Sequence, residues 1–323
     1  MVYKKKLILL SGLTALLALI YTAALIFDPE RVNARNAAFV WLDAEGADRA
    51  DSIVISRQGE EIVSLVRKNG LWFVPVEGID FPAKQARVED LFRILSTRGA
   101  YPLRAAAAAS HERLGLAEEA ASRIVIRGGA GAYPLLDLLA GDQDAAGREM
   151  YLRKQGQNEV RSGDTRIASY INGAAESWYD LRLFPEGSSG GAIDAGMIQR
   201  LIIEYPGGTA EPLALSRSGA GWTAGSLPAD TQRVESYIRS VLDAEGETFL
   251  PAQDGPVSGE GRIALELGDG TNRIIRCGPL DEEGKRRNAQ VTGSPHAYRL
   301  AEWTLGRLFR EASYFTAGGN EGP

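Results

Sequence analysis

Apolar and polar positions along the chain follow two periods, one typical of short strands and one of an amphipathic helix. Apolar residues at Ile53–Ile55, Ile62–Val66 and Leu71–Val76 predict three short strands. Turns at Gln58-Gly59 and Asn69-Gly70 separate them, and Asn-Gly suits a tight hairpin because both residues tolerate positive φ. This part of the chain is therefore predicted to form an antiparallel meander.

A proline-led amphipathic helix follows the meander. The segment FPAKQARVEDLFRIL runs from Phe81 to Leu95, and Pro82 stands where its missing N–H costs nothing at the start of a helix. Four apolar residues recur at i, i+3, i+4 and i+7, a spacing that places them on one helix face. They are Val88, Leu91, Phe92 and Leu95. The pattern predicts a helix that begins at Pro82 and covers a sheet.

More strands and a second helix complete the first half of the chain. Strands are predicted at Ile124–Ile126, Leu135–Leu139 and Met150–Leu152. Asp164 is predicted to be the N-cap of a helix. The apolar residues of that helix are Ile167, Tyr170 and Ile171.

The second half of the chain repeats this order. The segment LPADTQRVESYIRSVL, from Leu227 to Leu242, keeps the proline, alanine, Arg-Val-Glu and later arginine of the first helical segment. Three glycines also recur 137 residues later, at the turns that such glycines make possible. Gly141, Gly147 and Gly156 correspond to Gly278, Gly284 and Gly293. These matches indicate an internal duplication.

The predicted fold class is α+β: an N-terminal transmembrane helix, then two tandem duplicated β-rich units, each with an antiparallel sheet and about two helices. The expected divisions are a cytoplasmic stub and anchor at 1–27, a connector at 28–50 and a first unit at 51–186. A linker at 187–196, a second unit at 197–316 and a disordered tail at 317–323 follow. The linker is placed by the glycine- and serine-rich stretch that begins at Glu186.

An apolar segment near the N-terminus predicts a membrane anchor. Three lysines at positions 4–6 precede an uncharged run of 21 residues, from Leu7 to Phe27. As a helix this run would span about 30 Å, the thickness of a bilayer core. A cleaved signal peptide, with Thr22 and Ala24 before the cut, is the alternative. The lysines favour a cytoplasmic N-terminus at the inner membrane and a periplasmic or extracytoplasmic bulk.

The charge balance bears on the class of partner. Three of the 36 basic residues and none of the 42 acidic ones precede Asp28, so the remainder carries 33 against 42, a net charge of −9. An acidic surface repels phosphate backbones. Nucleic acid is therefore not an expected partner, whereas the bilayer is one through Leu7–Phe27.

Residue types with catalytic or metal-binding chemistry are few. With two histidines, His111 and His296, and a single cysteine, Cys277, neither a disulfide within the chain nor a zinc site of usual spacing can be assembled. Both histidines are interpreted as structural, His296 in a hairpin turn. Asp142 and Asp144 resemble a calcium loop in part, and a hairpin turn is expected there. No catalytic residue, metal site or cofactor is predicted.

Two duplicated residue pairs are the candidates for a ligand or partner surface. Arg87 and Arg233 recur within the helical segments, where they either bridge to a neighbouring element or bind a ligand. Trp72 and Trp222 follow hairpin turns on short strands. They either pack in the core or offer an aromatic face to a carbohydrate.

The order of these motifs supports a family resemblance. A lysine-flanked anchor, NGLWFV with its tryptophan, RVEDLFRIL, and RLGLAEEAASRIVI follow one another. This order resembles an uncharacterised family of membrane-anchored proteins associated with gliding-motility-type ABC transporters, whose shared domain is of unknown function. The resemblance covers about Asp51 to Phe315, and the second copy departs from it at Asp254–Gly261, where the Leu-Gly-Leu step is absent. It supplies no catalytic residues.

Three functions follow as hypotheses. The resemblance implies a non-enzymatic accessory or scaffolding component of an ABC transporter, with permease or ATPase subunits as partners, or of another cell-envelope complex. The tryptophan faces suggest a module that binds envelope polysaccharide or peptidoglycan. A hydrolase would need converging carboxylates in a cleft.

Overall fold

The computed structural model describes residues 16–19, 21–22, 39–129, 133–185, 193–219, 221–250 and 259–316. The predicted anchor at Leu7–Phe27 lies mostly outside these residues, as does the glycine- and serine-rich part of the predicted linker, and the predicted tail lies wholly outside them. Among the residues described, no helix is long and apolar enough to cross a membrane.

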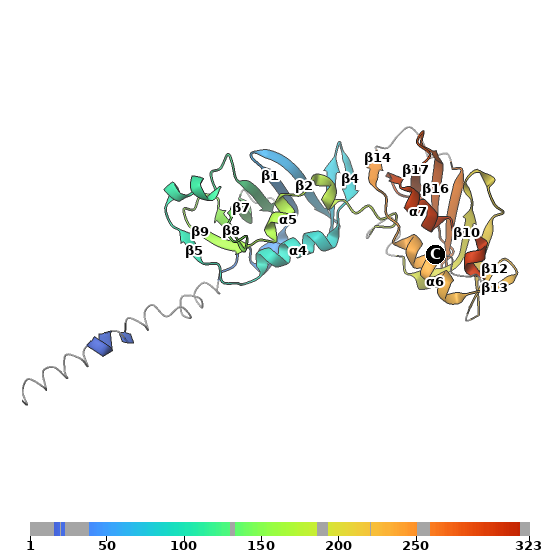
Figure 1. The fold of residues 1–323 in the computed structure, drawn as a ribbon, viewed down its shortest axis with the longest axis horizontal. Helices are drawn as coiled ribbons and strands as arrows, with labels where there is room; N and C mark the ends of the chain where they lie inside the picture. Colours follow the sequence, from blue (N-terminus) through green and yellow to red (C-terminus); the bar gives the residue numbers. More distant parts are fainter. Residues whose placement is uncertain are drawn as a thin grey trace, which may run out of the picture. The chain divides into compact units, whose positions relative to one another are not determined.

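Two nine-stranded sheets with the same strand order form the fold (Figure 1). The first sheet has the order β4-β3-β2-β1-β6-β7-β8-β9-β5, and the second has the order β13-β12-β11-β10-β15-β16-β17-β18-β14. Every strand therefore has a counterpart nine positions later in the strand numbering. This identity of order confirms the predicted tandem arrangement of two β-rich units.

The strands are short. The first sheet contains β1 (Ser52–Arg57), β2 (Glu60–Lys68), β3 (Leu71–Val76), β4 (Ile79–Pro82), β5 (Leu103–Ala105), β6 (Ser122–Arg127), β7 (Leu136–Gln143), β8 (Glu149–Lys154) and β9 (Val160–Asp164). The second contains β10 (Ile198–Glu204), β11 (Leu213–Ser218), β12 (Gly221–Ala224), β13 (Leu227–Ala229), β14 (Thr248–Leu250), β15 (Gly261–Leu267), β16 (Asn272–Leu280), β17 (Arg287–Val291) and β18 (Ala297–Leu300).

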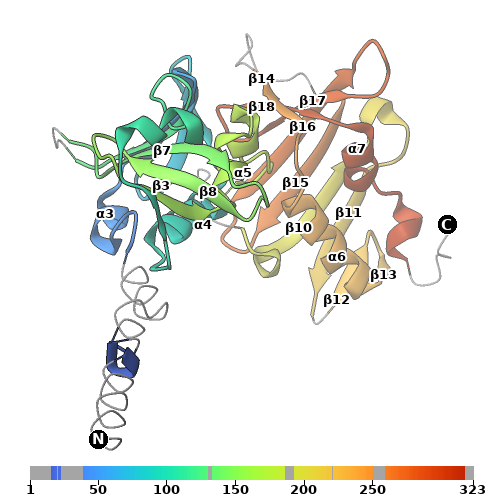
Figure 2. The same cartoon turned by 60° about the vertical axis from the view of Figure 1, so that its left-hand side comes forward.

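In the described ranges helices are few, and their main members are duplicated like the strands. The α-helices are α3 (Ala44–Arg49), α4 (Gln85–Ser96), α5 (Ile167–Ile171), α6 (Thr231–Leu242) and α7 (Glu302–Leu308). Single turns of 3₁₀ helix are η1 (Ala108–Ser110), η2 (Glu112–Leu114), η3 (Ala175–Trp178), η4 (Ala195–Met197), η5 (Pro206–Gly208) and η6 (Ala312–Phe315). Figure 2 shows α6 crossing one face of the second sheet, as the spacing of its apolar residues predicts.

Each sheet consists of two meanders joined at its centre. The first strand of each copy pairs antiparallel with the sixth, β1 with β6 and β10 with β15. The fifth strand, β5 or β14, is reached through the long helix and adds to the far edge beside β9 or β18. By its contacts the chain forms two compact units, Met1–Gly70 with Ala86–Ala175, and Leu71–Gln85 with Glu176–Pro323. The β3–β4 hairpin is thus grouped with the second unit.

The predicted turns of the first meander are confirmed. Gln58 and Gly59 have φ of 51° and 81°, and Asn69 and Gly70 have φ of 52° and 85°. Two successive residues with positive φ form the hairpin turn whose twist matches that of the strands. The predicted strands around these turns are β1, β2 and β3.

The predicted start of the long helices is wrong in both copies. Pro82 ends strand β4, where it pairs with Phe73, and α4 begins three residues later at Gln85. Pro228 likewise lies within β13, and Asp230 caps α6 by accepting a hydrogen bond from the backbone N–H of Arg233 at 3.1 Å. Proline is compatible with these positions because β4 and β13 are edge strands, where a missing N–H breaks no ladder bond.

The start of α5 also differs from the prediction. Asp164 is the last residue of β9, and the helix begins at Ile167 after Arg166. The Asp164 carboxylate accepts a hydrogen bond from the Arg166 backbone N–H at 2.9 Å, so it stabilises the turn before the helix rather than its first turn.

A bulged hairpin is preserved in detail between the copies. The pairing of β7 with β8 shifts register after Ala140, and that of β16 with β17 shifts after Cys277, in each case at the duplicated glycine Gly141 or Gly278. The Asp144 carboxylate then accepts two backbone N–H bonds, from Arg148 and Glu149. Asp281 accepts the equivalent bonds from Lys285 and Arg286. Asp144 therefore builds a hairpin turn, as predicted.

The Leu-Gly-Leu step packs against this bulge in the first copy. Gly115 ends η2 with a φ of 68°, and Leu116 is fully buried in a small cluster with Leu139 and Val160. A Cβ added to Gly141 would lie 2.2 Å from the Leu114 carbonyl oxygen, which is too close for any side chain. Two glycines are needed here because two backbones approach each other.

The core of the second unit is a continuous apolar cluster under α6. Phe315 is fully buried, and its ring meets the edge of Tyr237 with centroids 5.0 Å apart. Cys277 lies in the same cluster, where burial raises the pKa of its thiol to about 12. A thiol with so high a pKa is an inert core residue.

Candidate functional site

A pocket of about 200 Å³ lies within the second unit. Its walls come from the β3–β4 hairpin, from residues 183–185, from Arg273 on β16 and from the turn between β17 and β18. The lining residues are Phe73, Asp80, Pro82, Leu183, Phe184, Pro185, Arg273, Val291, Thr292, Gly293, Ser294, Pro295 and His296. Most of this surface is apolar, with a few polar groups, which is the usual composition of a binding site.

The β17–β18 turn is held in place by its own hydrogen bonds. Gly293 has a φ of 83°, a conformation that glycine adopts without strain. The Ser294 backbone N–H donates to the Val291 carbonyl at 3.0 Å, and the Ser294 hydroxyl accepts from the His296 backbone N–H at 3.1 Å. This turn therefore fixes His296 at the pocket wall.

His296 is buried among aromatic rings. Only 4% of the residue is exposed, and its imidazole lies 4.8 Å from the Phe81 ring, tilted by 31°. The Phe249 ring lies 5.4 Å away, and the two phenylalanine rings are 4.7 Å from each other. The imidazole thus packs between aromatic residues that are distant in the sequence.

The imidazole is held neutral with one nitrogen unused. Burial lowers the pKa of His296, and a hydrogen bond to the Asp80 backbone and the Asp80 charge oppose this shift. The buried Nδ1 has no hydrogen-bond partner among the described residues. A neutral imidazole that donates from one nitrogen has a lone pair on the other, so Nδ1 is assigned as a hydrogen-bond acceptor. An unpaired polar atom in such a place needs an explanation.

Arg273 supplies the positive charge of the pocket. Its guanidinium donates a long hydrogen bond of 3.4 Å to the carbonyl of the adjacent Asn272. Within the described part of the chain it forms no salt bridge of 4.0 Å or less. It is therefore available to a carbonyl or carboxylate oxygen.

The two duplicated arginines are candidates for a ligand surface in the sequence. In the structure, each one connects the long helix of its unit to a distant segment of the same unit. Arg87 donates to the Ser169 carbonyl at 2.7 Å and stacks 4.8 Å above the Tyr170 ring. Arg233 donates to the Tyr314 carbonyl at 3.2 Å and lies 5.9 Å from the Tyr314 ring. Their recurrence is explained by this shared bridging contact.

Loss of the Arg87 contact is expected to destabilise the protein moderately. Arg87→Ala should lower the free energy of unfolding by about 1–2 kcal/mol, because a hydrogen bond and a cation–π contact are lost together. Arg87→Lys should restore little of it, since lysine has no flat guanidinium to stack on Tyr170. Urea unfolding followed by circular dichroism measures both.

Arg93→Ala is the matched control on the same helix. Arg93 is 67% exposed and pairs with Asp90 at the surface, so its removal should cost about 0.5 kcal/mol or less. Equal losses for Arg87→Ala and Arg93→Ala would contradict the bridging role.

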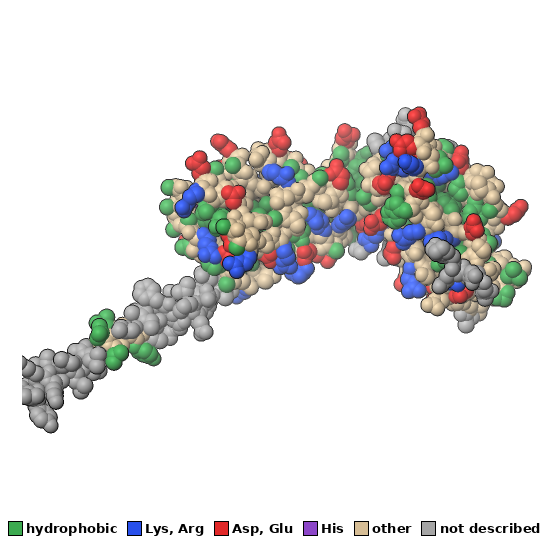
Figure 3. Space-filling view, in the orientation of Figure 1, with side chains coloured by type: hydrophobic (Ala, Val, Ile, Leu, Met, Phe, Trp, Pro, Cys, Tyr) green, Lys and Arg blue, Asp and Glu red, His purple; other side chains and the backbone are tan. Residues whose placement is uncertain are grey.

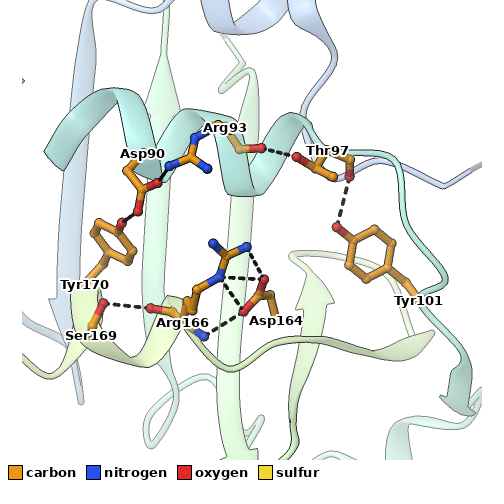
Figure 4. A network of polar contacts seen from close by, with 8 residues as sticks. All are labelled: Asp90, Arg93, Thr97, Tyr101, Asp164, Arg166, Ser169 and Tyr170. Carbon is orange, nitrogen blue, oxygen red and sulfur yellow. Dashed lines mark hydrogen bonds and ion pairs between the residues drawn. The ribbon is translucent and has the colours of Figure 1, made fainter. Parts of the chain in front are cut away.

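The polar face of α4 forms a network with the segment around α5 (Figure 4). Tyr170 donates a hydrogen bond to Asp90, which also pairs with Arg93, while Arg166 pairs with Asp164. Burial raises the pKa of Tyr170, which keeps its hydroxyl a donor. The charges in this network satisfy one another, so it serves packing rather than ligand binding.

The two tryptophans do not form a carbohydrate-stacking surface. Trp72 is 5% exposed and Trp222 is 3% exposed. The Trp222 ring is also covered by the Arg217 guanidinium, 4.8 Å from its centroid. Stacking of a sugar needs an accessible ring face. The two rings are buried, so they pack in the core and do not form an aromatic platform.

No group of three or more His, Cys, Asp or Glu side chains in the described ranges is arranged to hold a metal ion. His111 belongs to the first unit, where its Nε2 is 3.0 Å from the Asn158 carbonyl oxygen. Acidic and basic side chains are interspersed over the described surface that Figure 3 displays. The pocket around His296 is therefore the site with the most distinctive chemistry.

The pocket residues were not singled out by the sequence. His296 follows Gly293-Ser294-Pro295, and this signal predicts only a turn. A comparison of the two copies, position by position, could have pointed to these residues. In the first copy, the counterpart of His296 is the exposed Glu159, and the strand pairings make the buried Leu136 the counterpart of Arg273. Both distinctive polar groups therefore occur where the duplication is not kept.

Comparison with known proteins gives a family and no function. Neither a search of curated proteins nor one of solved structures found a match. A family model described as "Domain of unknown function (DUF4340)" matches residues 72–259, more than half of the 323 residues. The match runs from the start of β3 to just before β15, so it includes part of each copy. The chain belongs to the DUF4340 family.

Proposed function

We propose that this protein is a non-enzymatic, single-pass inner-membrane protein that exposes its two β-sheet units outside the cytoplasm. There it serves as an accessory or scaffolding component of an ABC transporter or another cell-envelope complex. The anchor and its orientation rest on the apolar run Leu7–Phe27 and the lysines before it. The transporter association rests on the family resemblance of the motif order.

One structural observation favours a binding role. A pocket of this duplicated scaffold is lined by His296 and by Arg273, whose guanidinium forms no salt bridge within the described residues and only a long hydrogen bond of 3.4 Å to the Asn272 carbonyl. Both groups appear only in the second copy. A scaffold that keeps its structural contacts in both copies and has an arginine without a carboxylate partner in the pocket of one copy is suited to present a binding site to a partner.

Affinity purification of the tagged, detergent-solubilised protein tests this function. A permease or ATPase subunit of an ABC transporter should be recovered with the wild-type protein. Thr292→Trp should reduce that recovery at least about tenfold, because Thr292 is exposed at the pocket and an indole there would block it.

The matched control is Gln157→Trp. Gln157 is exposed in the corresponding hairpin of the first copy and does not line the pocket, so the same indole is added to the other unit. This variant should recover the partner as the wild type does. Absence of any transporter subunit from the wild-type sample would remove the transporter assignment, and full recovery with Thr292→Trp would remove the role of the pocket.

A reporter fused after Gly46 tests the orientation. Alkaline phosphatase, which is active only outside the cytoplasm, should be active at this position, which follows the predicted anchor. A cytoplasmic reporter that fluoresces or functions there would overturn the proposed topology.

A further inference from the structure

One buried apolar contact of the second unit has two exposed leucines as its counterparts. In the β3–β4 hairpin, Phe81 is 7% exposed, and its ring lies 4.7 Å from the ring of Phe249 on β14. Leu227 on β13 is the counterpart of Phe81, and Leu103 on β5 is that of Phe249, at the same offset of 146 residues. Leu227 is 60% exposed and Leu103 is 46% exposed. Two side chains that correspond to a contacting pair are therefore both left at the surface.

The strand pairings support these correspondences independently of the sequence spacing. Phe249 pairs with Tyr298 on β18, and Leu103 pairs with Arg161 on β9, the strand that corresponds to β18. β5 is an edge strand of the first sheet, and β13 is an edge strand of the second. Each leucine is therefore on a sheet edge, where another chain can reach it.

The strand that carries Leu227 keeps its apolar sequence although it is largely exposed. The segment Phe81-Pro82-Ala83 is buried at all three positions. In its counterpart, Leu227-Pro228-Ala229, the first two residues are exposed and the third is half-buried. A bridge from Ala229 to Thr316 borders only the end of this segment. Sheet edges that stay free usually carry charged residues, and this one carries none, which favours an edge that is covered by a partner.

The polar residues beside the two leucines are compatible with the same contact. In the second unit, a hydrogen bond joins the His296 side chain to the backbone of Asp80. The counterparts of these residues are Glu159 and Ser226, and both are exposed. A serine hydroxyl can donate to the carboxylate of a glutamate, whereas an aspartate at that position would repel it. The exchange of Asp80 for Ser226 therefore suits an edge that has Glu159 in place of His296.

We propose that the β12–β13 hairpin of one molecule docks on the edge formed by β5 and β9 of a second copy of this chain, with Leu227 packed against Leu103. The contact repeats, between two molecules, the one that Phe81 makes with Phe249. Two different surfaces meet, so each molecule of a pair keeps one free hairpin or one free edge unless a ring closes. The protein thus associates with itself head to tail. This self-association goes beyond the proposed transporter role and does not depend on it.

Cross-linking of two single-cysteine variants tests the pairing of the two surfaces. Leu227→Cys and Leu103→Cys are prepared as full-length proteins with different tags, in detergent with an excess of empty micelles, and mixed with a short bismaleimide. The mixture should give a dimer that carries both tags, and each variant alone should give at least about tenfold less, because a heterologous contact does not bring two like surfaces together. The native Cys277 is fully buried, and the wild-type protein measures its background.

Met197→Cys is the matched control for the position of the thiol. Met197 is 51% exposed and belongs to the same unit as Leu227, but it has no part in the proposed contact. Mixed with Leu103→Cys, it should give no more product than the wild-type background. Absence of a product from the Leu227→Cys and Leu103→Cys mixture would overturn the proposal. A dimer of Leu227→Cys with itself, at equal yield, would show that two hairpins meet instead and would also overturn it.

Substitutions of Leu227 test the apolar character of the contact. Leu227→Asp should weaken self-association at least about tenfold, since a carboxylate would be buried against Leu103. Leu227→Phe introduces the ring that Phe81 has and should strengthen self-association several-fold. Sedimentation equilibrium in density-matched detergent measures the dissociation constants, and circular dichroism verifies that these surface variants fold. Equal dissociation constants for the wild type and both variants would contradict the contact.

A different protein on the same hairpin would give a distinct result. Leu227→Asp would then lose a partner in affinity purification, while the wild-type protein would sediment as a single chain, and the proposed self-association would be wrong. A transporter subunit should be recovered equally well with Leu227→Asp and with the wild type. The two proposals can therefore fail separately.

Discussion

Phe315→Ala is expected to lower the free energy of unfolding of the second unit by about 3–5 kcal/mol. Phe315 is fully buried and belongs to the apolar cluster that lies under α6. Its ring contacts the edges of Tyr237 and Tyr314, with centroid distances of 5.0 and 5.1 Å. Removal of the ring leaves a cavity that the surrounding strands cannot close, so both the buried surface and the aromatic contacts are lost.

The Phe315 substitution also tests how the C-terminal segment of the second copy is attached to the start of α6. The backbone N–H of Asp230, the N-cap of α6, donates to the Phe315 carbonyl at 2.8 Å. A cavity beside this contact should loosen the start of the helix as well as the core. Chemical unfolding monitored by circular dichroism measures the loss. Trp303→Ala is the control because Trp303 is 58% exposed, and it should cost about 0.5 kcal/mol or less.

Gly141→Ala is expected to destabilise the first unit by about 1–3 kcal/mol or more. The added Cβ would lie 2.2 Å from the Leu114 carbonyl oxygen and 2.9 Å from the Leu116 side chain. Main chain cannot rotate away as a flexible side chain can, so β7 and the segment after η2 must separate. The small cluster around Leu116 would open as a result.

Gly306→Ala is a control with the opposite sign. Gly306 lies in α7, where an added Cβ meets no atom within 4 Å. Alanine there should stabilise the protein by about 0.5–1 kcal/mol because it restricts the unfolded chain and favours the helix. Thermal unfolding of both variants measures the two changes in stability, which should be opposite in sign. A neutral Gly141→Ala would show that the two backbones do not approach as closely as described.

The sequence carries much of the fold because duplication and turn chemistry are local signals. Positive φ at Asn69-Gly70 and the aspartate turn at Asp144 depend on a few adjacent residues, and both are found where predicted. The identical strand order of the two sheets extends the repeat that the glycine offset indicates. The edge strands β5 and β14 escape prediction since each has three residues, too few to show a period.

The start of the long helices shows how a local rule can mislead. Proline is favoured both at the first position of a helix and in an edge strand. The sequence around Pro82 fits the first position of a helix. In the structure, Pro82 pairs with Phe73 and therefore belongs to an edge strand. Only the neighbouring strand distinguishes the two, and the local sequence does not contain it.

The residues of the candidate site are hard to predict from the sequence for a related reason. His296 is interpreted as a turn residue, and its burial comes from Phe81 and Phe249, which no local pattern connects to it. Conversely, the duplicated Arg87 and Arg233 stand out in the sequence and prove to bridge each long helix to a backbone carbonyl. Repetition marks what both copies need for stability, and the polar residues of the pocket that we propose as a binding site lie where the copies diverge.

The central pairing of each sheet determines where the chain can be divided. β1 pairs with β6 and β10 with β15, so the middle of each sheet joins segments from opposite ends of a copy. The region that matches the family model, residues 72–259, contains β6 without β1 and β10 without β15. A fragment with those boundaries would expose the inner strand of both sheets, with unpaired N–H and C=O groups open to aggregation. The boundaries of the region that matches the family model therefore do not coincide with those of either sheet.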